Sequence, residues 1–363
     1  MIIGATADSS DGRLVALSGV DVVSGYKQRL VQWCFEGIWP PLEPLVSGPI
    51  PSPEDAAKVC YVILVSESLE APHFLNARKG AWVRTNEFSQ RFDHHLAKYD
   101  ELEHLRARRI LLVERREKTI ERAFSRFQTY LASAHSSTLG SNEPSQATMF
   151  LVVSPLFPSR QLVSEQELEK QVVSFVVRWR QVGFPSISRK VTQKESVLLL
   201  NPSGDFSLFE ATSFGQLFYA FDIIDSDTTL RGGSVPQSIH LYELLGHILV
   251  VLQHAGVLLA RLGYRGDVIL RTRLFGIRNV PLVRPIDYGR TTSAHSPLDN
   301  DFELELSMNA ERLISNRDEE ARSLIRILLF AVNWSHLAGD ERALDQLILD
   351  GYRYNFWEPP IGN

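Results

Sequence analysis

The arrangement of apolar and polar positions predicts alternating strands and helices from the start of the chain. Two short apolar runs, Ile2–Thr6 and Arg13–Leu17, flank an acidic segment that contains the hairpin signal Asp11-Gly12. Apolar residues then recur at intervals of three and four from Asp21 to Gly37, which predicts a helix. We expect its apolar stripe to be a core face, formed by Val22, Tyr26, Leu30, Trp33 and Cys34.

Two different patterns follow that helix. Residues 38–53 contain six prolines, and because proline has no backbone N–H to give to a strand ladder, this segment is predicted to be an extended crossing loop. Residues 58–66 form a nearly continuous apolar run, which predicts a buried strand.

A long helical pattern covers residues 100–133. Most of its charged residues have an opposite charge three or four positions away, which is typical of a solvated helix that connects two domains or pairs with a second copy. Its apolar residues form a roughly continuous stripe, made of Leu105, Leu112, Ile120, Phe124, Phe127 and Leu131.

A small, polar segment at residues 134–148 indicates a domain boundary, with a linker at 136–147. Beyond it, the pattern predicts a mostly antiparallel sheet with helices on one face. The predicted strands are Met149–Ser154, Val197–Leu200, Phe206–Ala211, Leu217–Ile224, Val268–Phe275 and Phe302–Leu306; the predicted helices are 164–180, 238–262, 317–337 and 340–350, and 281–300 is predicted to be a polar loop.

These elements indicate an α+β protein in three parts. Residues 1–98 form a sheet-and-helix domain, residues 99–135 a long charged connector helix, and residues 148–363 a C-terminal α+β domain.

The densest group of surface chemistry lies between Ala71 and Phe92. Pro72 ends the preceding strand, Gly80 permits a turn, and Trp82–Thr85 alternates as a new strand. Cations and amide donors gathered at a turn and a strand edge are groups that contact phosphates, although a solvated basic turn has the same composition. We predict a nucleic-acid contact here, with a secondary contact on the long helix; the residues are His73, Asn76, Arg78, Lys79, Arg84, Arg91, Arg106 and Arg109.

Several short motifs in this part of the chain occur in a fixed order. They are Ile2-Ile3-Gly4, Pro40-Pro41-Leu42, Pro72-His73-Phe74-Leu75-Asn76, Arg78-Lys79-Gly80, and Val83-Arg84-Thr85 followed by Glu87–Phe92. Together they resemble the Schlafen-type, Alba-like DNA-binding domain over about residues 1–135. The resemblance implies a sheet-and-helix domain that binds nucleic acid, with DNA favoured over RNA.

One part of the family pattern is absent. Members open with a strand bearing a Glu-x-Lys-like signature and a helix, whereas this chain starts at the glycine-bearing strand Ile2-Ile3-Gly4. The resemblance therefore implies a partial domain whose first strand has an unpaired apolar edge, which a second copy or a partner chain would cover. The acidic residues that support RNA cleavage in animal Schlafen relatives have no counterpart here, so a ribonuclease is the least favoured function.

The composition is that of a globular protein, since 363 residues with 44% hydrophobic content suit about two domains. A net charge of −5 means that nucleic-acid binding needs a local basic patch. The two cysteines, Cys34 and Cys60, are too few for a disulfide framework or a thiolate metal site. The first residues lack a signal-peptide pattern, and the richest apolar run, 248–262, is interrupted by polar residues; we expect a cytoplasmic protein without membrane contact.

Candidate catalytic groups lack the spacing that catalysis needs. His240, His247 and His254 lie seven apart on one predicted helix, with about 10.5 Å between neighbours, so they cannot share a metal ion and are expected on a partly wet face. Glu303 and Glu305 share a strand face, which is typical of the solvent side of a sheet. No P-loop, dinucleotide-binding or Gly-x-Ser-x-Gly motif occurs, so the sequence favours a protein without cofactor, metal or catalytic activity.

Three classes of function remain at this point. The first is nucleic-acid binding, chiefly from the resemblance and the basic turn. The second is an assembly or interaction protein that another copy or a partner chain completes, and the third is a Schlafen-like ribonuclease. Binding assays across salt separate the first two, because phosphate contacts give a steep salt dependence.

Overall fold

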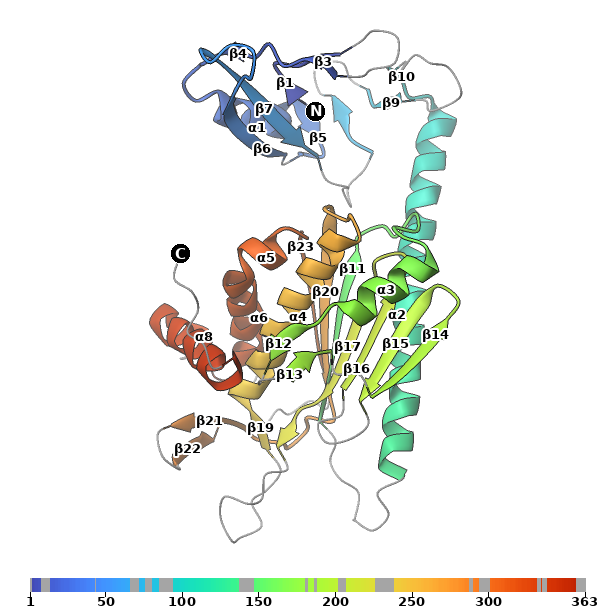
Figure 1. The fold of residues 1–363 in the computed structure, drawn as a ribbon, viewed down its shortest axis with the longest axis vertical. Coiled ribbons are helices and arrows are strands. Elements are labelled where there is room, and N and C mark those ends of the chain that lie inside the picture. Colours follow the sequence, from blue (N-terminus) through green and yellow to red (C-terminus); the bar gives the residue numbers. More distant parts are fainter. Residues whose placement is uncertain are drawn as a thin grey trace. The chain divides into compact units, whose positions relative to one another are not determined.

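A computed structural model of the chain shows an α+β protein, which confirms the predicted fold class. It forms two compact units, an N-terminal unit of residues Met1–Val113 and a C-terminal unit of residues Glu114–Asn363 (Figure 1). The structure describes residues 2–7, 14–42, 44–65, 72–75, 80–84, 94–136, 147–179, 182–185, 188–201, 207–225, 238–286, 290–293, 301–331, 334 and 338–356.

A four-stranded antiparallel sheet and one helix are the centre of the N-terminal unit. Strand β7 pairs with β6 on one side and with β1 and β4 on the other. Further strand pairs are β2–β3, β5–β8 and β9–β10. The elements are β1 (Ile2–Ile3), β2 (Thr6–Ala7), β3 (Leu14–Ala16), β4 (Val20–Asp21), α1 (Tyr26–Gly37), β5 (Ile38–Trp39), β6 (Leu45–Pro51), β7 (Lys58–Leu64), β8 (Phe74–Leu75), β9 (Trp82–Arg84), β10 (His94–Leu96) and the first part of α2 (Tyr99–Ser136).

The predicted helix at 21–37 is confirmed from Tyr26 onward, but its start and packing differ from the prediction. Asp21 belongs to β4 and pairs with Lys58, so the helix begins five residues later. Of the predicted core stripe, Leu30 is buried, whereas Val22 is 63% exposed and Trp33 58% exposed. The helix lies on a narrow sheet, so only one row of its side chains reaches the core.

The prediction of a crossing loop over residues 38–53 was wrong, because the segment contains β5 and the seven-residue strand β6. Its prolines fit since β6 pairs with β7 alone among the described strands, and its register shifts between Ser47 and Ile50. Proline is tolerated at sheet edges and bulges, where its missing N–H removes no ladder hydrogen bond. At the bulge, Gly48 has a φ of +130°, and a Cβ there would meet the Tyr61 ring at 2.8 Å.

A seven-stranded antiparallel sheet forms the centre of the C-terminal unit, in the order β14-β15-β16-β17-β11-β20-β23. The strands are β11 (Thr148–Pro155), β14 (Arg189–Gln193), β15 (Ser196–Asn201), β16 (Ser207–Thr212), β17 (Leu217–Asp222), β20 (Asp267–Phe275) and β23 (Asp301–Asn309). The predicted strands are therefore confirmed. Every residue of β11 is buried, because this central strand is covered on both faces.

Helices cover one face of this sheet, as predicted. They are α3 (Glu165–Ser174), α4 (Leu241–Arg261) and α5 (Arg312–Ser315), while α6 (Arg317–Ala331) and α8 (Glu341–Phe356) pack on the outside of α4. Ser164 caps α3 by accepting a hydrogen bond from the N–H of Glu167 at 3.3 Å. Helix α4 is long and apolar enough to cross a membrane, but 78% of its most apolar window is buried inside the unit, which makes it the core helix here.

Two smaller sheets depart from the predictions. The predicted helix at 164–180 ends at Ser174, and its last residues enter β12 (Val177–Trp179), which pairs with β13 (Val182–Phe184). The predicted loop at 281–300 contains β21 (Leu282–Ile286) and β22 (Arg290–Ser293). Together with β18 (Ile224–Asp225) and β19 (Ser238–His240), these two strands form a four-stranded sheet.

The second half of α2 packs on the other face of the seven-stranded sheet. Phe127 is fully buried and stacks on Phe150 of β11, with ring centroids 5.7 Å apart, and Ile120 is 1% exposed. The predicted apolar stripe of the helix is therefore a core face at 120–131, whereas Leu105 in the N-terminal unit is 37% exposed. The division between the units falls inside α2 and not in the polar segment 134–148, because this half of the helix belongs to the C-terminal core.

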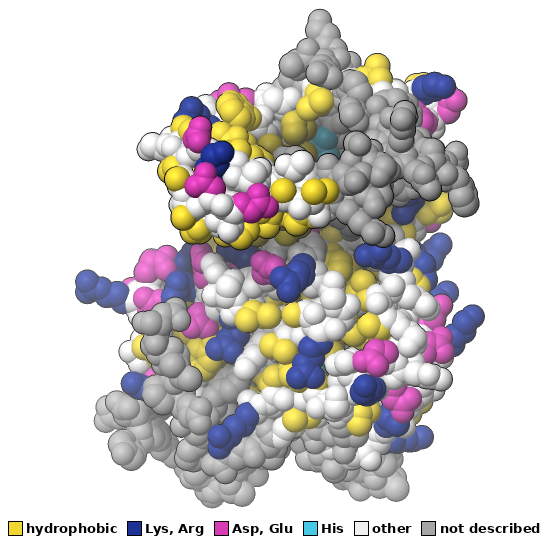
Figure 2. Space-filling model, turned by 45° about the horizontal axis from the view of Figure 1, so that its top comes forward, with side chains coloured by type: hydrophobic (Ala, Val, Ile, Leu, Met, Phe, Trp, Pro, Cys, Tyr) yellow, Lys and Arg dark blue, Asp and Glu magenta, His cyan; other side chains and the backbone are white. Residues whose placement is uncertain are grey.

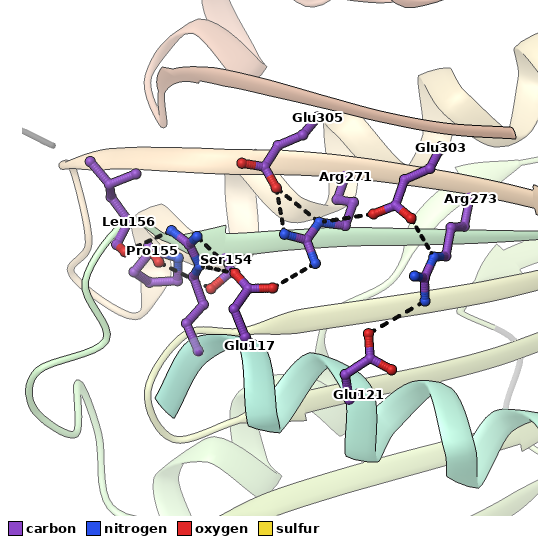
Figure 3. Close-up of polar contacts among 10 residues, drawn as sticks. Glu117, Glu121, Ser154, Pro155, Leu156, Arg271, Arg273, Glu303 and Glu305 are labelled. Carbon is purple, nitrogen blue, oxygen red and sulfur yellow. Dashed lines mark hydrogen bonds and ion pairs between the residues drawn. The ribbon is translucent and has the colours of Figure 1, made fainter. Parts of the chain in front are cut away.

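Ion pairs accompany this apolar contact. Arg271 of β20 lies between carboxylates of α2 and β23, 2.8 Å from Glu117 and 2.6 Å from Glu305 (Figure 3). Arg273, two residues along β20, pairs with Glu303 at 2.7 Å and with Glu121 at 3.5 Å. The predicted solvent side of β23 therefore holds carboxylates that bind arginines beneath a helix.

The ion pairs set the protonation of the groups in them. Burial acts to raise the pKa of Glu117, but hydrogen bonds from Arg271 and Arg116 outweigh it and hold the pKa below its usual value. On the same helix, Arg126 pairs with Glu210 of β16 at 2.5 Å, and Glu210 is 1% exposed. The cations on the sheet side of α2 are thus matched by carboxylates.

The histidines of α4 do not lie on a partly wet face, contrary to the prediction. His247 is 4% exposed and His254 fully buried, because aromatic side chains of the sheet and of the β12–β13 hairpin cover them. The hydroxyl of Tyr219 lies 2.9 Å from Nδ1 of His254. Burial lowers the pKa of His254 to about 3, so its ring is neutral at physiological pH.

Candidate functional site

The four-stranded sheet of the N-terminal unit has one covered face. On that face Val46, Val59, Tyr61 and Ile63 are buried together with Leu30 of α1. The alternate residues of the same strands point to the opposite face, because successive side chains of a strand alternate between its two sides. In antiparallel sheets, a face that meets water usually carries polar side chains.

The opposite face is mostly apolar in this sheet, and Ser47 of β6, in register with Val62, is an exposed polar residue on it. Ile2 lies across from Val62 and Leu45 across from Leu64, so each pair is in direct cross-strand contact range. These residues and Ile50 are between 37% and 51% exposed. We call Ile2, Leu45, Ile50, Val62 and Leu64 the open sheet face; Figure 2 shows hydrophobic side chains at the surface of the N-terminal unit.

Charge is confined to one end of this face. Asp21 of β4 and Lys58 of β7 have opposite signs and lie across from each other in register. Between Lys58 and Val62, Cys60 is 5% exposed, with its Sγ 3.8 Å from the carbonyl oxygen of Gly4. The open sheet face therefore offers apolar contact and no array of acid–base groups.

The edges of the sheet are less suited than its open face to binding another chain. The predicted edge strand at 2–6 is present as the two-residue strand β1, and the opposite edge strand, β6, carries Pro49 and Pro51. A short edge exposes few backbone groups, and proline removes a donor, so neither edge is a good template for another strand.

The predicted nucleic-acid site lies largely outside the described residues. For Arg84 the structure describes the backbone, which forms β9 and lies across from His94 of β10. Leu75 and Gly80 form an isolated antiparallel bridge, with a hydrogen bond of 2.9 Å from the N–H of Leu75 to the carbonyl oxygen of Gly80. The predicted residues outside the description are Asn76, Arg78, Lys79 and Arg91.

Three predicted residues have described side chains. Nδ1 of His73 lies 2.7 Å from the carbonyl oxygen of Pro40, so this ring nitrogen holds the backbone and does not face an anion. Arg106 pairs with Glu103 at 3.0 Å, and its side chain is 55% exposed. Arg109 is half-buried on α2. Because Arg106 is already paired with Glu103, its charge is less available to a phosphate, which weakens the predicted secondary contact on the long helix.

Sequence reasoning missed the open sheet face. Leu45 and Ile50 fall in the segment predicted to be a loop, and Val62 and Leu64 fall in a strand predicted to be buried. Consecutive residues of β7 are apolar, including those on both faces of the strand. Its sequence pattern therefore cannot show which face remains exposed to solvent. The pairing of β6 with β7 is the information that the sequence did not supply.

Comparisons of the chain with protein-family models, with curated proteins and with solved structures each find no match.

Proposed function

We propose that this is an assembly protein whose N-terminal unit binds a second copy of the chain through the open sheet face. The observation that carries the proposal is that five aliphatic side chains, each at least 37% exposed, share that face. Contiguous exposed apolar surface marks interaction sites in soluble proteins. Burying it is favourable by roughly 25 cal/mol per Å² of apolar area removed from water.

The chemistry of the face supports a second copy as the occupant. In a two-fold symmetric contact, each residue meets its own counterpart or a neighbour of it, so a charged face would repel itself. The open sheet face consists of uncharged aliphatic side chains, and the charges at its end, Asp21 and Lys58, have opposite signs. Two such sheets can pack face to face at the usual spacing of about 10 Å.

The size of the face sets the expected strength. A standard protein interface buries about 800 Å² on each partner, and five partly exposed aliphatic residues provide only the core of such an area. We therefore expect a weak dimer that forms at tens of micromolar.

Light scattering on the full chain tests the proposal with a matched pair of variants. Leu45→Lys with Val62→Lys places two like charges on the open sheet face, and both positions are exposed enough to keep the fold. The control, Val15→Lys with Val22→Lys, adds the same charge at positions 65% and 63% exposed outside that face. We expect the first variant to be monomeric and the control to dimerise like the unchanged protein.

Two results would refute the assembly function. One is a dimer that persists in the variant with lysines at positions 45 and 62. The other is equal loss of dimer in the control, which would mean that added charge and not the location of the residues controls association.

Nucleic-acid binding is a second candidate function, favoured by the backbone structure around the predicted basic turn between Ala71 and Phe92. The backbone of Arg84 lies in β9, which pairs with β10, and this agrees with the strand predicted to carry one of the phosphate contacts. Arg78 and Lys79, the other two predicted contacts, lie outside the described residues. The resemblance of the same segment to a Schlafen-type domain agrees with this reading.

Charge reversal of Arg78, Lys79 and Arg84 to Glu tests the second candidate. If these residues are the main phosphate contact, the variant loses DNA binding in a mobility-shift assay while its thermal unfolding stays nearly unchanged, because exposed charges contribute little to folding. Unaltered DNA binding by this variant would show that Arg78, Lys79 and Arg84, which we call the basic hairpin, are not the main phosphate contact.

A further inference from the structure

The outer side of α2 in the C-terminal unit carries a row of cations. We infer that Arg115, Lys118 and Arg122 form a contact site for the phosphate backbone of a nucleic acid. This site is independent of the proposed self-association and of the basic hairpin, because it lies in the other unit. We call these three residues the cation row.

Helical spacing places the cation row on one side of α2. The three residues are separated by three and four positions, which stack on the same helix face. The buried residues Ile120, Ala123 and Phe127 occupy the sheet side of the helix. All three cations of the row are exposed, with the side chain of Lys118 at 71%.

The cation row differs from the sheet side of the same helix in how its charge is balanced. On the sheet side, Arg126 is paired with Glu210 at 2.5 Å. Within the described residues, Arg115 and Arg122 make no ion pair, and Lys118 has a single solvent-exposed carboxylate partner, Glu114, at 3.7 Å. The charge of the row is therefore available to an external anion.

One member of the row is held in position. The guanidinium carbon of Arg115 lies 3.9 Å from the ring centroid of Phe214, in the turn between β16 and β17. A cation stacked on an aromatic ring loses less conformational freedom on binding than a free side chain. The N–H groups of a guanidinium lie in its own plane, so stacking on the ring leaves them able to donate to phosphate oxygens.

The spacing of the row fits a nucleic-acid strand. Seven residues of helix separate Arg115 from Arg122, which is about 10.5 Å along the axis. One strand of DNA carries a phosphate every 3.4 Å or so along its axis, so the row spans about three phosphates.

A membrane surface fits this side of α2 less well. Helices that bind lipid place large apolar side chains next to their cations. Two large apolar side chains lie at one end of the row: Ile110 and Leu111 are 58% and 63% exposed, and Leu111 is one helical turn before Arg115. Among the described residues of α2 beyond them, none is an exposed large hydrophobic residue, so Lys118 and Arg122 lack the apolar neighbours that insertion into lipid requires.

Fluorescence anisotropy with a short labelled DNA duplex, and with a single strand of the same length, tests the cation row. The row variant changes Arg115, Lys118 and Arg122 to Glu. The control variant changes Lys170, Arg265 and Arg342 to Glu, which alters the net charge equally at exposed positions on other elements. The hairpin variant, with Arg78, Lys79 and Arg84 changed to Glu, is measured in parallel.

The row variant is expected to lose more than about tenfold in affinity, with the control unchanged. The salt slope of log Kobs is expected to become shallower by about 2.7 on the duplex and about 2.1 on the single strand, since three phosphate contacts are lost. Circular dichroism checks that α2 is intact. If reversal unfolds the protein, the same three positions changed to Gln give the same loss of slope.

Several results would overturn the inference. They are an absence of DNA binding by the unchanged protein, equal loss in the control, and unaltered affinity in the row variant while the hairpin variant loses all binding. Binding to anionic lipid vesicles that depends on the row, without binding to either DNA, would assign these cations to a membrane surface instead.

Discussion

The two sheets of this protein differ in what lies on their second face. In the C-terminal unit that face carries Arg271 and Arg273, whose side chains are only 13% and 26% exposed beneath a helix of the same chain, while their partner Glu305 on β23 stays 41% exposed. In the N-terminal unit the corresponding face is aliphatic, with Val62 and Leu64 at 37% and 38% exposure. The arginines of the charged face are thus covered by a helix, whereas the aliphatic residues of the N-terminal face are open, although composition alone suggests the reverse.

This difference shows that a sheet face is buried when a complementary surface packs on it, whether the face itself is charged or apolar. Arg271 can lie 13% exposed at its side chain because Glu117 and Glu305 supply opposite charge at hydrogen-bonding distance. The open sheet face needs only another apolar surface, and a second copy of the chain provides one.

The largest effect is expected where α2 is part of a core. Phe127→Ala removes a fully buried ring that stacks on Phe150, so it should cost about 3–5 kcal/mol of unfolding free energy. Leu105→Ala, on the same helix but 37% exposed, should cost less than about 1 kcal/mol. Urea denaturation measures both; equal costs would contradict the assignment of only the second half of α2 to a core.

An acid-dependent loss of stability is expected from His254. Its folded pKa of about 3 lies below the ordinary 6.5, so its contribution is fully present above pH 6.5 and is lost as pH falls toward 3. The free energy of unfolding should drop by up to about 1.4 kcal/mol per pH unit in this window.

Denaturation between pH 6.5 and about 5 isolates this histidine from the carboxylates, whose ordinary pKa is 4.5. His254→Phe should flatten the slope by about one proton, because the unfolded variant no longer gains that proton. A slope unchanged in His254→Phe would show that another group titrates in this range.

A smaller effect is expected from the ion pairs beneath α2. Arg271→Met leaves Glu117 and Glu305 without their shared partner and should cost about 1–3 kcal/mol. A double-mutant cycle with Glu117→Gln separates the pair from the packing of the methylene groups. Additive costs would mean that this ion pair contributes nothing to holding the helix on the sheet.

The sequence predicted the parts of this fold in which one period dominates. Six strands of the seven-stranded sheet, helix α4 and helix α2 carry long, clear patterns, and the structure confirms them, whereas the edge strand β14 was not predicted. The sequence-based prediction failed where strand pairing decides which secondary structure forms. Val177–Trp179 forms a strand paired with Val182–Phe184, and not the end of a helix, because Trp179 and Phe184 pack on α4 and cover His247 and His254.

The candidate site was harder to predict for the same reason. Whether Leu45 and Ile50 matter depends on which strand they pair with and what covers that strand, and neither is encoded in local periodicity. The exposed aromatic residues of α1 give a similar lesson, since Trp33 occupies a core position by spacing yet is 58% exposed. The local sequence pattern specifies whether a segment forms a helix or a strand. How much of that helix or strand is buried depends on the area of the surface that packs against it.

Sedimentation velocity of the unchanged full chain over a range of concentrations tests the central claim most directly. The account predicts a monomer at low concentration that becomes a dimer at tens of micromolar, and a variant with lysines at positions 45 and 62 that stays monomeric throughout. A clean monomer across the whole range, with wild type and variant indistinguishable, would contradict the claim that a second copy covers the open sheet face.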